Sequence, residues 1–267
     1  MPKTSIAIIG GSGLEKLFEN PEQSIIKTPY GAAPPVSIGK VGGKQVVFLP
    51  RHGFDHSVPP HRINYRASIW ALHTLGVTRI LATNAVGAIN RDFKPGQIAI
   101  PRDFVDFTKA RCSTFYDEAP VMHVDFSQPY CPQLRKLLLK SARKNGLHVR
   151  DKAVMVCTEG PRLETPAEIE MFRHLGGDIV GMTGFPEVVL ARELEMCYAS
   201  TCYVSNMAAG IRNELSAHGV LRVSKQIISK QIMPRLEKLL IETISGLPIK
   251  REKACPCAGA LRSARFG

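Results

Sequence analysis

Residues 179–205 read IVGMTGFPEVVLARELEMCYASTCYVS and decide the fold, because they pass from a strand to a helix and back to a strand. Ile179–Met182 is a short apolar strand. Pro186–Leu194 has the apolar spacing of a helix, with a proline in the first turn, where a helix tolerates it. Cys197–Ser205 is a longer apolar strand. The stretch predicts an α/β sheet with a helix packed on it.

The same alternation continues on both sides of this stretch. Strands are predicted at Ile6–Ile9, Val46–Leu49, Arg79–Thr83 and Ala153–Cys157, and helices at Tyr65–Leu75, Pro132–Asn145, Glu168–Leu175 and Val223–Ile244. Neither an internal repeat nor a long linker interrupts the pattern. We therefore expect one α/β domain over residues 1–267, with a central sheet flanked by helices and a short tail from about Pro248.

The composition is that of a soluble globular protein, with 44% apolar and 22% charged residues in a chain of 267. No apolar run approaches the roughly 20 residues that cross a bilayer. The first residues, MPKTSIAIIG, enter a strand without the layout of a signal peptide. A cytoplasmic protein without a membrane partner is the expectation.

The formal net charge of +12 raises the question of a nucleic-acid partner. Lysine and arginine are spread along the chain, with only a modest cluster at Lys250, Arg251 and Lys253. A basic surface serves an anionic small substrate equally well. We expect such a substrate, and no nucleic acid, to be the partner.

Seven cysteines are many for a reducing compartment. None belongs to a Cys-x-x-Cys pair, so we expect neither a zinc ribbon nor another metal site. Cys255 and Cys257 form a Cys-Pro-Cys pair in the tail. Redox-active thiols, a structural disulfide and free thiols all remain open for this pair, because sequence does not determine connectivity.

Hydrogen-bond donors follow several predicted strands, where open α/β sheets place their ligands. Ser12 lies in GGSG, whose glycines let backbone N–H groups approach an anion. Arg51 and His52 follow the second strand, with His56 close behind, and a guanidinium and an imidazole suit a phosphate. Thr183 adds a donor just before a helix. Each cluster alone is also compatible with a tight turn or a solvated loop, but together they predict bound phosphate.

Two carboxylates, Glu159 and Glu164, flank a Gly-Pro turn in CTEGPRLETPAE, residues 157–168. Glu164 can favour the positive end of the following helix, or it can present an acceptor to a pocket. Asn206 ends an apolar strand, where an amide is commonly a turn former. The same amide can donate and accept at once, as the O6 and N7 edge of a purine requires.

The motifs IIGGSG, PRHG-x-x-H, TNAVGA, TEGPR and GMTGFPEVVLARE occur in this order over nearly all of the chain. They resemble the purine nucleoside phosphorylase and methylthioadenosine phosphorylase family, and the last motif is long and specific. The resemblance implies a single-domain α/β fold around a distorted mixed sheet, in a homotrimer or a hexamer built from trimers. It also implies phosphorolysis, in which phosphate attacks C1′ of a nucleoside to release a purine base and a sugar 1-phosphate. Phosphate is then a co-substrate, and no metal or organic cofactor is implied.

The resemblance assigns roles to individual residues. The phosphate ligands are Ser12, Arg51, His52, Asn84, Ala85 and Thr183. Met182 matches the residue that lies under the ribose and donates its backbone N–H to a sugar hydroxyl, and Leu163 is assigned to the substrate. His56 matches a histidine near the phosphate and the 5′ side of the sugar. His123 resembles one that reaches the 5′ group from the neighbouring subunit.

The chemistry of phosphorolysis fits these assignments. Glycosidic cleavage passes through an oxocarbenium-like state, so a phosphate dianion held under C1′ stabilises positive charge while acting as the nucleophile. The departing purine gains negative charge, and a group that hydrogen-bonds or protonates N7 makes it a better leaving group. We assign catalytic roles to Asn206, Glu164 and His56.

The family divides according to the purine base. Phosphorylases selective for 6-oxopurines carry glutamate and asparagine where this chain has Glu164 and Asn206. The methylthioadenosine branch has serine and aspartate there, and a second aspartate at the position of Ala208. A 6-oxopurine has a hydrogen on N1, which a carboxylate accepts, whereas adenine presents a lone pair that a carboxylate repels. The Asn206 amide can donate to O6 and accept from protonated N7.

The 5′ side resembles the other branch. In NELSAHGVLRV, alignment on the Val-Leu pair puts Ala217 where the 6-oxopurine enzymes have a histidine, with His218 one residue away. An apolar residue there suits a methylthio group. We therefore predict 5′-methylthioinosine as the favoured substrate, with inosine and guanosine close behind. A methylthioadenosine phosphorylase is the first alternative. A non-catalytic nucleotide- or nucleic-acid-binding protein on the same fold is the second.

Overall fold

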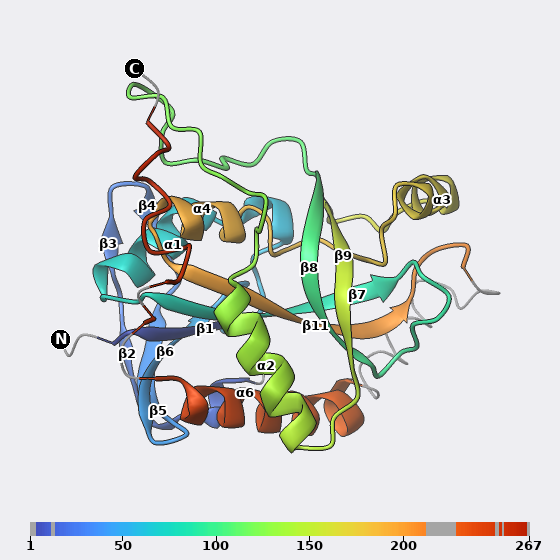
Figure 1. Ribbon diagram of the computed structural model, residues 1–267, viewed down its shortest axis with the longest axis horizontal. Coiled ribbons are helices and arrows are strands. Elements are labelled where there is room, and N and C mark those ends of the chain that lie inside the picture. The colour runs from blue at the N-terminus through green and yellow to red at the C-terminus, as the bar shows by residue number, and fades with distance from the viewer. Residues whose placement is uncertain (1–3, 12–13, 212–227, 249–250, 253, 266–267) are drawn as a thin grey trace.

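The computed structural model describes residues 4–11, 14–211, 228–248, 251–252 and 254–265 (Figure 1). Within these residues a nine-stranded sheet has the order β10-β9-β8-β11-β7-β1-β6-β5-β2. Its strands are β1 (Ile6–Gly10), β2 (Glu19–Ser24), β5 (Val36–Val41), β6 (Lys44–Pro50), β7 (Arg79–Ala88), β8 (Ile98–Phe107), β9 (Val149–Thr158), β10 (Ile179–Gly181) and β11 (Cys197–Met207). A small hairpin pairs β3 (Lys27–Thr28) with β4 (Gly31–Ala32).

The sheet is mixed and closes partly on itself. β1 is parallel to β6 and β7, whereas β8 is antiparallel to β11 and parallel to β9. β10 pairs with β9 in parallel and with β7 in antiparallel, so β7, β11, β8, β9 and β10 form a ring. This geometry confirms the α/β fold and the distorted mixed sheet that the family resemblance implied.

Helices cover both faces of the sheet (Figure 1). Successive residues of a strand point to opposite faces, and β1 shows this plainly. Ala7 and Ile9 belong to the apolar cluster that contains α1 (Tyr65–Thr74) and α4 (Glu187–Glu193). Ile6 and Ile8 belong to the cluster that contains α2 (Pro132–Lys144) and α6 (Met233–Gly246). The centre of the sheet is therefore buried on both faces.

A smaller cluster lies at the far ends of the strands. α3 (Pro166–His174) packs Ile169 and Phe172 against Val156, Val180 and Ala208. The helix starts with a capping box, in which Thr165 and Glu168 satisfy each other's backbone N–H groups. Single turns of other helix types complete the described elements: η1 (Leu14–Leu17), η2 (Pro60–Arg62) and the π-helical η3 (Ile228–Ile232).

Several predicted elements differ from the observed ones at their ends. β7 was predicted to end at Thr83 but continues to Ala88, because it pairs with β11 along its whole length. The TNAVGA motif is therefore part of a strand. The helix predicted at Val223–Ile244 is described from residue 228, where a π-helical turn precedes α6. Residues 223–227 lie outside the described residues.

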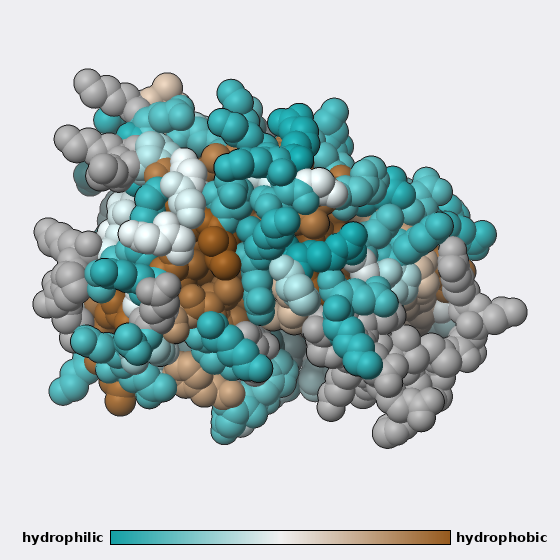
Figure 2. Space-filling model, turned by 90° about the horizontal axis from the view of Figure 1, so that it is seen from below, coloured by the Kyte–Doolittle hydropathy of each residue, from teal (hydrophilic) through white to brown (hydrophobic). Residues whose placement is uncertain are grey.

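Three strands of the main sheet were missed. β8 contains Pro101 and polar residues beyond it, and β2 reads ENPEQS, so neither shows an uninterrupted apolar pattern. β5 contains Gly39, which weakens a strand signal. Within the described residues, no helix has the length and apolar character needed to span a membrane. Seen from the side of Figure 2, hydrophilic side chains cover most of the surface, with apolar patches between them.

Candidate active site

The carboxyl ends of β1 and β6 lie beside the middle of β7, because the three strands are parallel neighbours. Ile9 is in register with Ala82, and the Arg51 N–H donates to the Gly10 carbonyl at 2.9 Å. Gly10 has no space for a side chain, since a Cβ there would lie 2.6 Å from the Leu14 Cδ1. The register of β1 with β7 and the hydrogen bond from Arg51 to Gly10 place Arg51 beside the strand that carries Asn84.

Arg51 is almost completely buried and forms a two-point ion pair with Glu187 at the start of α4. Its Nη1 also donates to the Thr83 carbonyl at 2.8 Å, and Tyr198 donates its hydroxyl to Glu187 at 2.7 Å. Burial opposes the charged form of Arg51, but the Glu187 charge and hydrogen bond outweigh it and hold the Arg51 pKa above its usual value. Three of the five guanidinium N–H groups have partners among the described residues, so one N–H on each Nη atom can serve a ligand.

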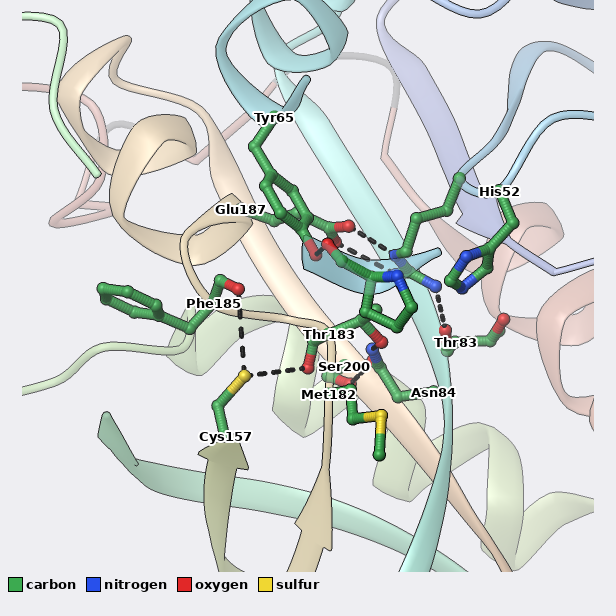
Figure 3. Close-up of polar contacts among 12 residues, drawn as sticks. His52, Tyr65, Thr83, Asn84, Cys157, Met182, Thr183, Phe185, Glu187 and Ser200 are labelled. Atoms are coloured by element: carbon green, nitrogen blue, oxygen red, sulfur yellow. Dashed lines mark hydrogen bonds and ion pairs between the residues drawn. The ribbon is translucent and has the colours of Figure 1, made fainter. Parts of the chain in front are cut away.

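The side chains of Asn84 and Thr183 meet beside this ion pair (Figure 3). Ser200 donates to the Asn84 Oδ1 at 2.6 Å, and the Asn84 Nδ2 donates to the Thr183 Oγ1 at 2.8 Å. Both Asn84 and Thr183 are buried. Because the Thr183 oxygen accepts from Asn84, its own hydrogen remains available to a further acceptor. The chain of hydrogen bonds therefore presents Thr183 as a donor.

His52 lies on the other side of the ion pair in Figure 3. Its Nδ1 lies 2.8 Å from the Val58 carbonyl, so Nδ1 carries the hydrogen. Burial, together with the nearby Arg51 and His56, lowers the pKa of His52 to about 4 despite the Val58 hydrogen bond. The His52 ring is therefore neutral at pH 7. His56 is exposed, and its ring centre lies 4.6 Å from that of His52.

Arg111, on the loop after β8, joins the other strand ends. Its Nη2 donates to the carbonyls of Thr158, Glu159 and Met182 at 3.1, 2.9 and 2.8 Å. Its Nη1 donates to the Phe185 carbonyl at 2.7 Å, and its Nε lies 3.6 Å from the Glu159 carboxylate. One guanidinium thus connects the ends of β9 and β10. Our sequence reasoning missed Arg111, which belongs to none of the recognised motifs.

The two acids of the Gly-Pro turn have different surroundings. Glu159 accepts from the Lys109 backbone N–H at 2.7 Å, so it holds the loop that carries Arg111. Glu164 is half-buried and accepts from the Thr158 hydroxyl at 2.7 Å through Oε1. Its second oxygen can accept from a ligand. Glu164 precedes Thr165, the N-cap of α3, but the cap itself is made by Thr165 and Glu168.

Asn206 lies at a bulge of β11, opposite Gly87 of β7. Its Oδ1 accepts from Ser205 at 2.7 Å, and its Nδ2 donates to the Met207 carbonyl at 2.8 Å. Since a carbonyl only accepts, the amide orientation is fixed. Asn206 on β11 and Thr158 at the end of β9, which holds Glu164, belong to the same ring of strands, in which both strands pair with β8.

Met182 follows β10 directly. A Cβ on Gly160 would lie 2.6 Å from its sulfur, so the turn of the TEGPR motif lies against the Met182 side chain. Gly160 has φ +68°, which glycine adopts without strain. Ala85 is an exposed residue of β7, and Leu163 is exposed just before Glu164.

One assigned residue is not brought into this group, and two others lie outside the described residues. His123 is exposed, and its N–H donates to the Ala264 carbonyl at 2.7 Å, beside the bridge from Met122 to Arg265. It therefore lies with the C-terminal tail. Ser12 and Ala217 lie outside the described residues. Glu187, by contrast, is central to the site and was not singled out, although it lies within the GMTGFPEVVLARE motif.

Known proteins resemble this chain along its length. It matches the model of the phosphorylase superfamily over residues 5–245. It is 52% identical over 264 residues to a probable S-methyl-5′-thioinosine phosphorylase of Methanopyrus kandleri, covering 98% of this chain and 99% of that protein. It is 48% identical over 272 residues to the 6-oxopurine nucleoside phosphorylase of Pyrococcus furiosus, covering 99% of each.

Solved structures agree with this likeness. A methylthioadenosine phosphorylase from an Antarctic soil metagenomic library superposes with a TM-score of 0.91 at 33% identity, covering 100% of this chain and 93% of that one. The family resemblance inferred from the motifs is thereby confirmed. On the match to the family model over residues 5–245 and on the common fold, the chain belongs to the phosphorylase superfamily.

Proposed function

We propose that this protein cleaves the N-glycosidic bond of 6-oxopurine nucleosides with inorganic phosphate, and that 5′-methylthioinosine is its favoured substrate. The products are hypoxanthine and 5-methylthioribose 1-phosphate, and the reaction serves purine salvage. The observation that carries the choice of base is the pair Glu164 and Asn206. Glu164 has one carboxylate oxygen without a hydrogen-bond donor among the described residues, and Asn206 has a fixed amide.

Phosphate is bound by the donors around the ion pair. The Thr183 hydroxyl and the two unused Arg51 N–H groups supply hydrogens, and Ser12 and Ala85 extend the site. His52 is neutral with its hydrogen on Nδ1, so its Nε2 accepts a hydrogen bond from a protonated oxygen of the bound phosphate rather than donating one. Phosphate held under C1′ then stabilises the positive charge of the sugar as it attacks.

The base is read by two groups of opposite character. The second oxygen of Glu164 accepts the N1 hydrogen of a 6-oxopurine, which adenine lacks. The Met207 carbonyl fixes the Asn206 amide, whose remaining N–H donates to O6 and whose oxygen accepts from N7 as it is protonated. Adenine would place a lone pair against the carboxylate and an amino group against the amide N–H. Each mismatch costs about 1–3 kcal/mol.

The remaining roles concern the sugar. Met182 lies under the ribose, with Leu163 beside the base and His56 on the 5′ side. Ala217 makes the 5′ pocket apolar, which favours the methylthio group. The Methanopyrus kandleri relative carries the name of a methylthioinosine phosphorylase, which supports this preference. We further propose a cytoplasmic homotrimer or dimer of trimers, in which His123 completes the neighbour's 5′ pocket and no cofactor takes part in the reaction.

A product assay tests the proposal. Purified protein is incubated with excess phosphate and with methylthioinosine, inosine or methylthioadenosine, and the released base is quantified. We expect hypoxanthine from methylthioinosine fastest, then from inosine, with little adenine. Faster release of adenine would overturn the choice of base and make the protein a methylthioadenosine phosphorylase. No phosphate-dependent release from any of the three would overturn the enzymatic function, with reactions lacking phosphate as the control.

A further inference from the structure

Four of the seven cysteines converge at one buried place outside the active site. They are Cys131, Cys197, Cys255 and Cys257, and their sulfur atoms all lie within 4.8 Å of one another. Cys131 precedes α2, Cys197 begins β11, and the other two come from the tail. All seven cysteines lie among the described residues, and all are free thiols. Of the three alternatives for the tail pair, the structure therefore has free thiols.

We propose that these four sulfurs bind one zinc ion in a tetrahedral structural site. Zinc–sulfur bonds of about 2.3 Å place the corners of a regular tetrahedron about 3.8 Å apart. The Cys255 sulfur lies 3.8 Å from that of Cys131 and 3.4 Å from that of Cys197. A four-sulfur tetrahedral site is the arrangement that selects zinc, or iron, over harder metals. No step of the proposed phosphorolysis depends on it.

The spacing fits a metal better than two disulfides. Sulfur atoms in a disulfide are about 2.05 Å apart, and each cysteine then has a single partner. Here Cys255 lies at similar distances from two sulfurs that belong to different elements. All four residues are shielded from solvent, so the ligands are protected from exchange with water.

The backbone supports deprotonated sulfurs at this site. Cys131 is the N-cap of α2, and the positive end of a helix favours a thiolate. The Cys131 N–H also donates to the Tyr198 carbonyl at 2.8 Å, which fixes Cys131 beside the start of β11.

The charge around the cluster suits a zinc ion with four thiolates. Zn²⁺ displaces four thiol protons, so the site has a net charge of −2. Arg79 is buried and interacts electrostatically with Cys131, Cys197 and Cys255, and Arg251 lies close enough to interact with Arg79. The Arg79 guanidinium therefore offsets part of this negative charge.

The cluster borders a cavity at Cys197. A cavity of about 410 Å³ is lined by Cys197, Arg79 and Arg251, and by residues of α2 and the end of α6. The absence of Cys-x-x-Cys pairs, on which our expectation of no metal rested, does not exclude this site. Its ligands come from three segments that only the fold brings together.

The site would tie the tail to the sheet. Cys255 and Cys257 would be held against the first residue of β11 and the start of α2. Because binding occurs in the folded chain, its free energy adds to the free energy of unfolding. We therefore assign the zinc a structural role.

Metal analysis of the full-length wild-type protein tests the proposal. Elemental mass spectrometry should find about one zinc ion per chain. A mercurial reagent that blocks thiols should release this zinc. X-ray absorption spectra at the zinc edge should give sulfur neighbours at about 2.3 Å. Protein in which cobalt replaces zinc should show the visible absorption of a tetrahedral thiolate site. Protein without zinc that carries disulfides would overturn the proposal, as would protein with free thiols that binds neither zinc nor cobalt. Iron in place of zinc would overturn the choice of metal.

Matched variants test the ligands. Cys257→Ser should lower the zinc content at least tenfold, whereas Cys202→Ser should leave it unchanged, because Cys202 is buried in β11 outside the cluster. Equal zinc in both variants would contradict the assignment. If Cys257→Ser does not fold, the wild-type zinc content and the cobalt spectrum still decide the question.

Discussion

His52 and Asn206 each donate a hydrogen to a backbone carbonyl, that of Val58 and that of Met207. A carbonyl can only accept, so each contact fixes which side-chain atom carries the hydrogen. The Nε2 of His52 and the oxygen of Asn206 are thereby left as acceptors. The two bonds determine which hydrogens a phosphate or a purine must bring to the site.

The lowered pKa of His52 predicts a loss of stability in mild acid. The imidazole titrates near 6.5 in the unfolded chain and at about 4 in the folded one. Between these values the unfolded chain binds more protons, so the stabilisation is complete above pH 6.5 and is lost as the pH falls toward 4. We expect the free energy of unfolding to fall by about 2 kcal/mol over this range because of His52, after allowing for solvent at its partly buried ring.

Urea unfolding between pH 7 and 4 measures this contribution. The free energy of unfolding of the wild type should fall more steeply with acid than that of His52→Gln. His61→Gln is the control, because His61 is exposed, and its profile should follow the wild type. Parallel profiles for the wild type and His52→Gln would contradict the prediction.

Glu164→Gln should weaken the recognition of 6-oxopurines selectively. The amide can turn a donor toward N1, so the charged acceptor is lost while the volume is kept. We expect kcat/KM for methylthioinosine to fall about 10- to 100-fold, with a smaller change for methylthioadenosine. Glu170→Gln is the control, since Glu170 is exposed on α3 and pairs with Arg173. Equal losses on both substrates would mean that Glu164 does not read N1.

The polar residues of the site were predictable only in part. Arg51, His52 and Thr183 follow strands and belong to motifs, so the sequence singles them out. The side chains with which the site residues pair were not predictable from the sequence. Glu187 is 136 positions away from Arg51, and Ser200 is 116 away from Asn84. Only the fold establishes these pairs, because side-chain chemistry does not specify which distant residue will be the neighbour.

Arg111 shows how a loop can organise the ends of two strands. Its guanidinium donates to carbonyls of β9 and of the turn after β10, and lysine cannot reproduce this planar set of donors. Arg111→Lys should therefore lower kcat/KM about 10- to 100-fold, mainly through a higher KM, as the turns around Met182 loosen.

Arg102→Lys is the matched control, because Arg102 is exposed on β8 and should tolerate the change. Steady-state kinetics with methylthioinosine and thermal unfolding of both variants provide the readout. A wild-type KM in Arg111→Lys would show that the strand ends hold their positions without this guanidinium.

Elements with a clear apolar period were predicted well, and the others were not. β1, β6 and α1 are buried as their patterns indicate. β8 was missed because it is buried only in its first four residues and turns polar after Pro101. It is held by pairing with β9 along nearly its whole length and with β11 at its start. Backbone pairing of this kind leaves little trace in a sequence.

At the scale of the whole molecule, His123 lies apart from the proposed phosphate donors. Arg51, Asn84 and Thr183 are buried in the group around the Arg51–Glu187 ion pair, whereas exposed His123 lies on the segment that pairs with the tail. The proposed trimer assigns His123 to the site of a neighbouring subunit. A ring of subunits related by a closed rotation places the same segment beside every site. The proposed trimer therefore makes a prediction about mixed subunits.

Subunits with His123→Ala and subunits with Thr183→Ala should complement each other when they assemble together. Each homogeneous variant has a defect at every site, but a mixed ring contains some sites with His123 from one subunit and Thr183 from the next. Random mixing in equal amounts makes such sites about a quarter of the total, and in a ring of three every mixed ring has one such site, so the purified mixed trimers should recover about a third of wild-type activity. Co-expression with two different tags and purification through both isolates the mixed oligomers. Activity no higher than the mean of the two variants would mean that His123 serves the site of its own chain or none.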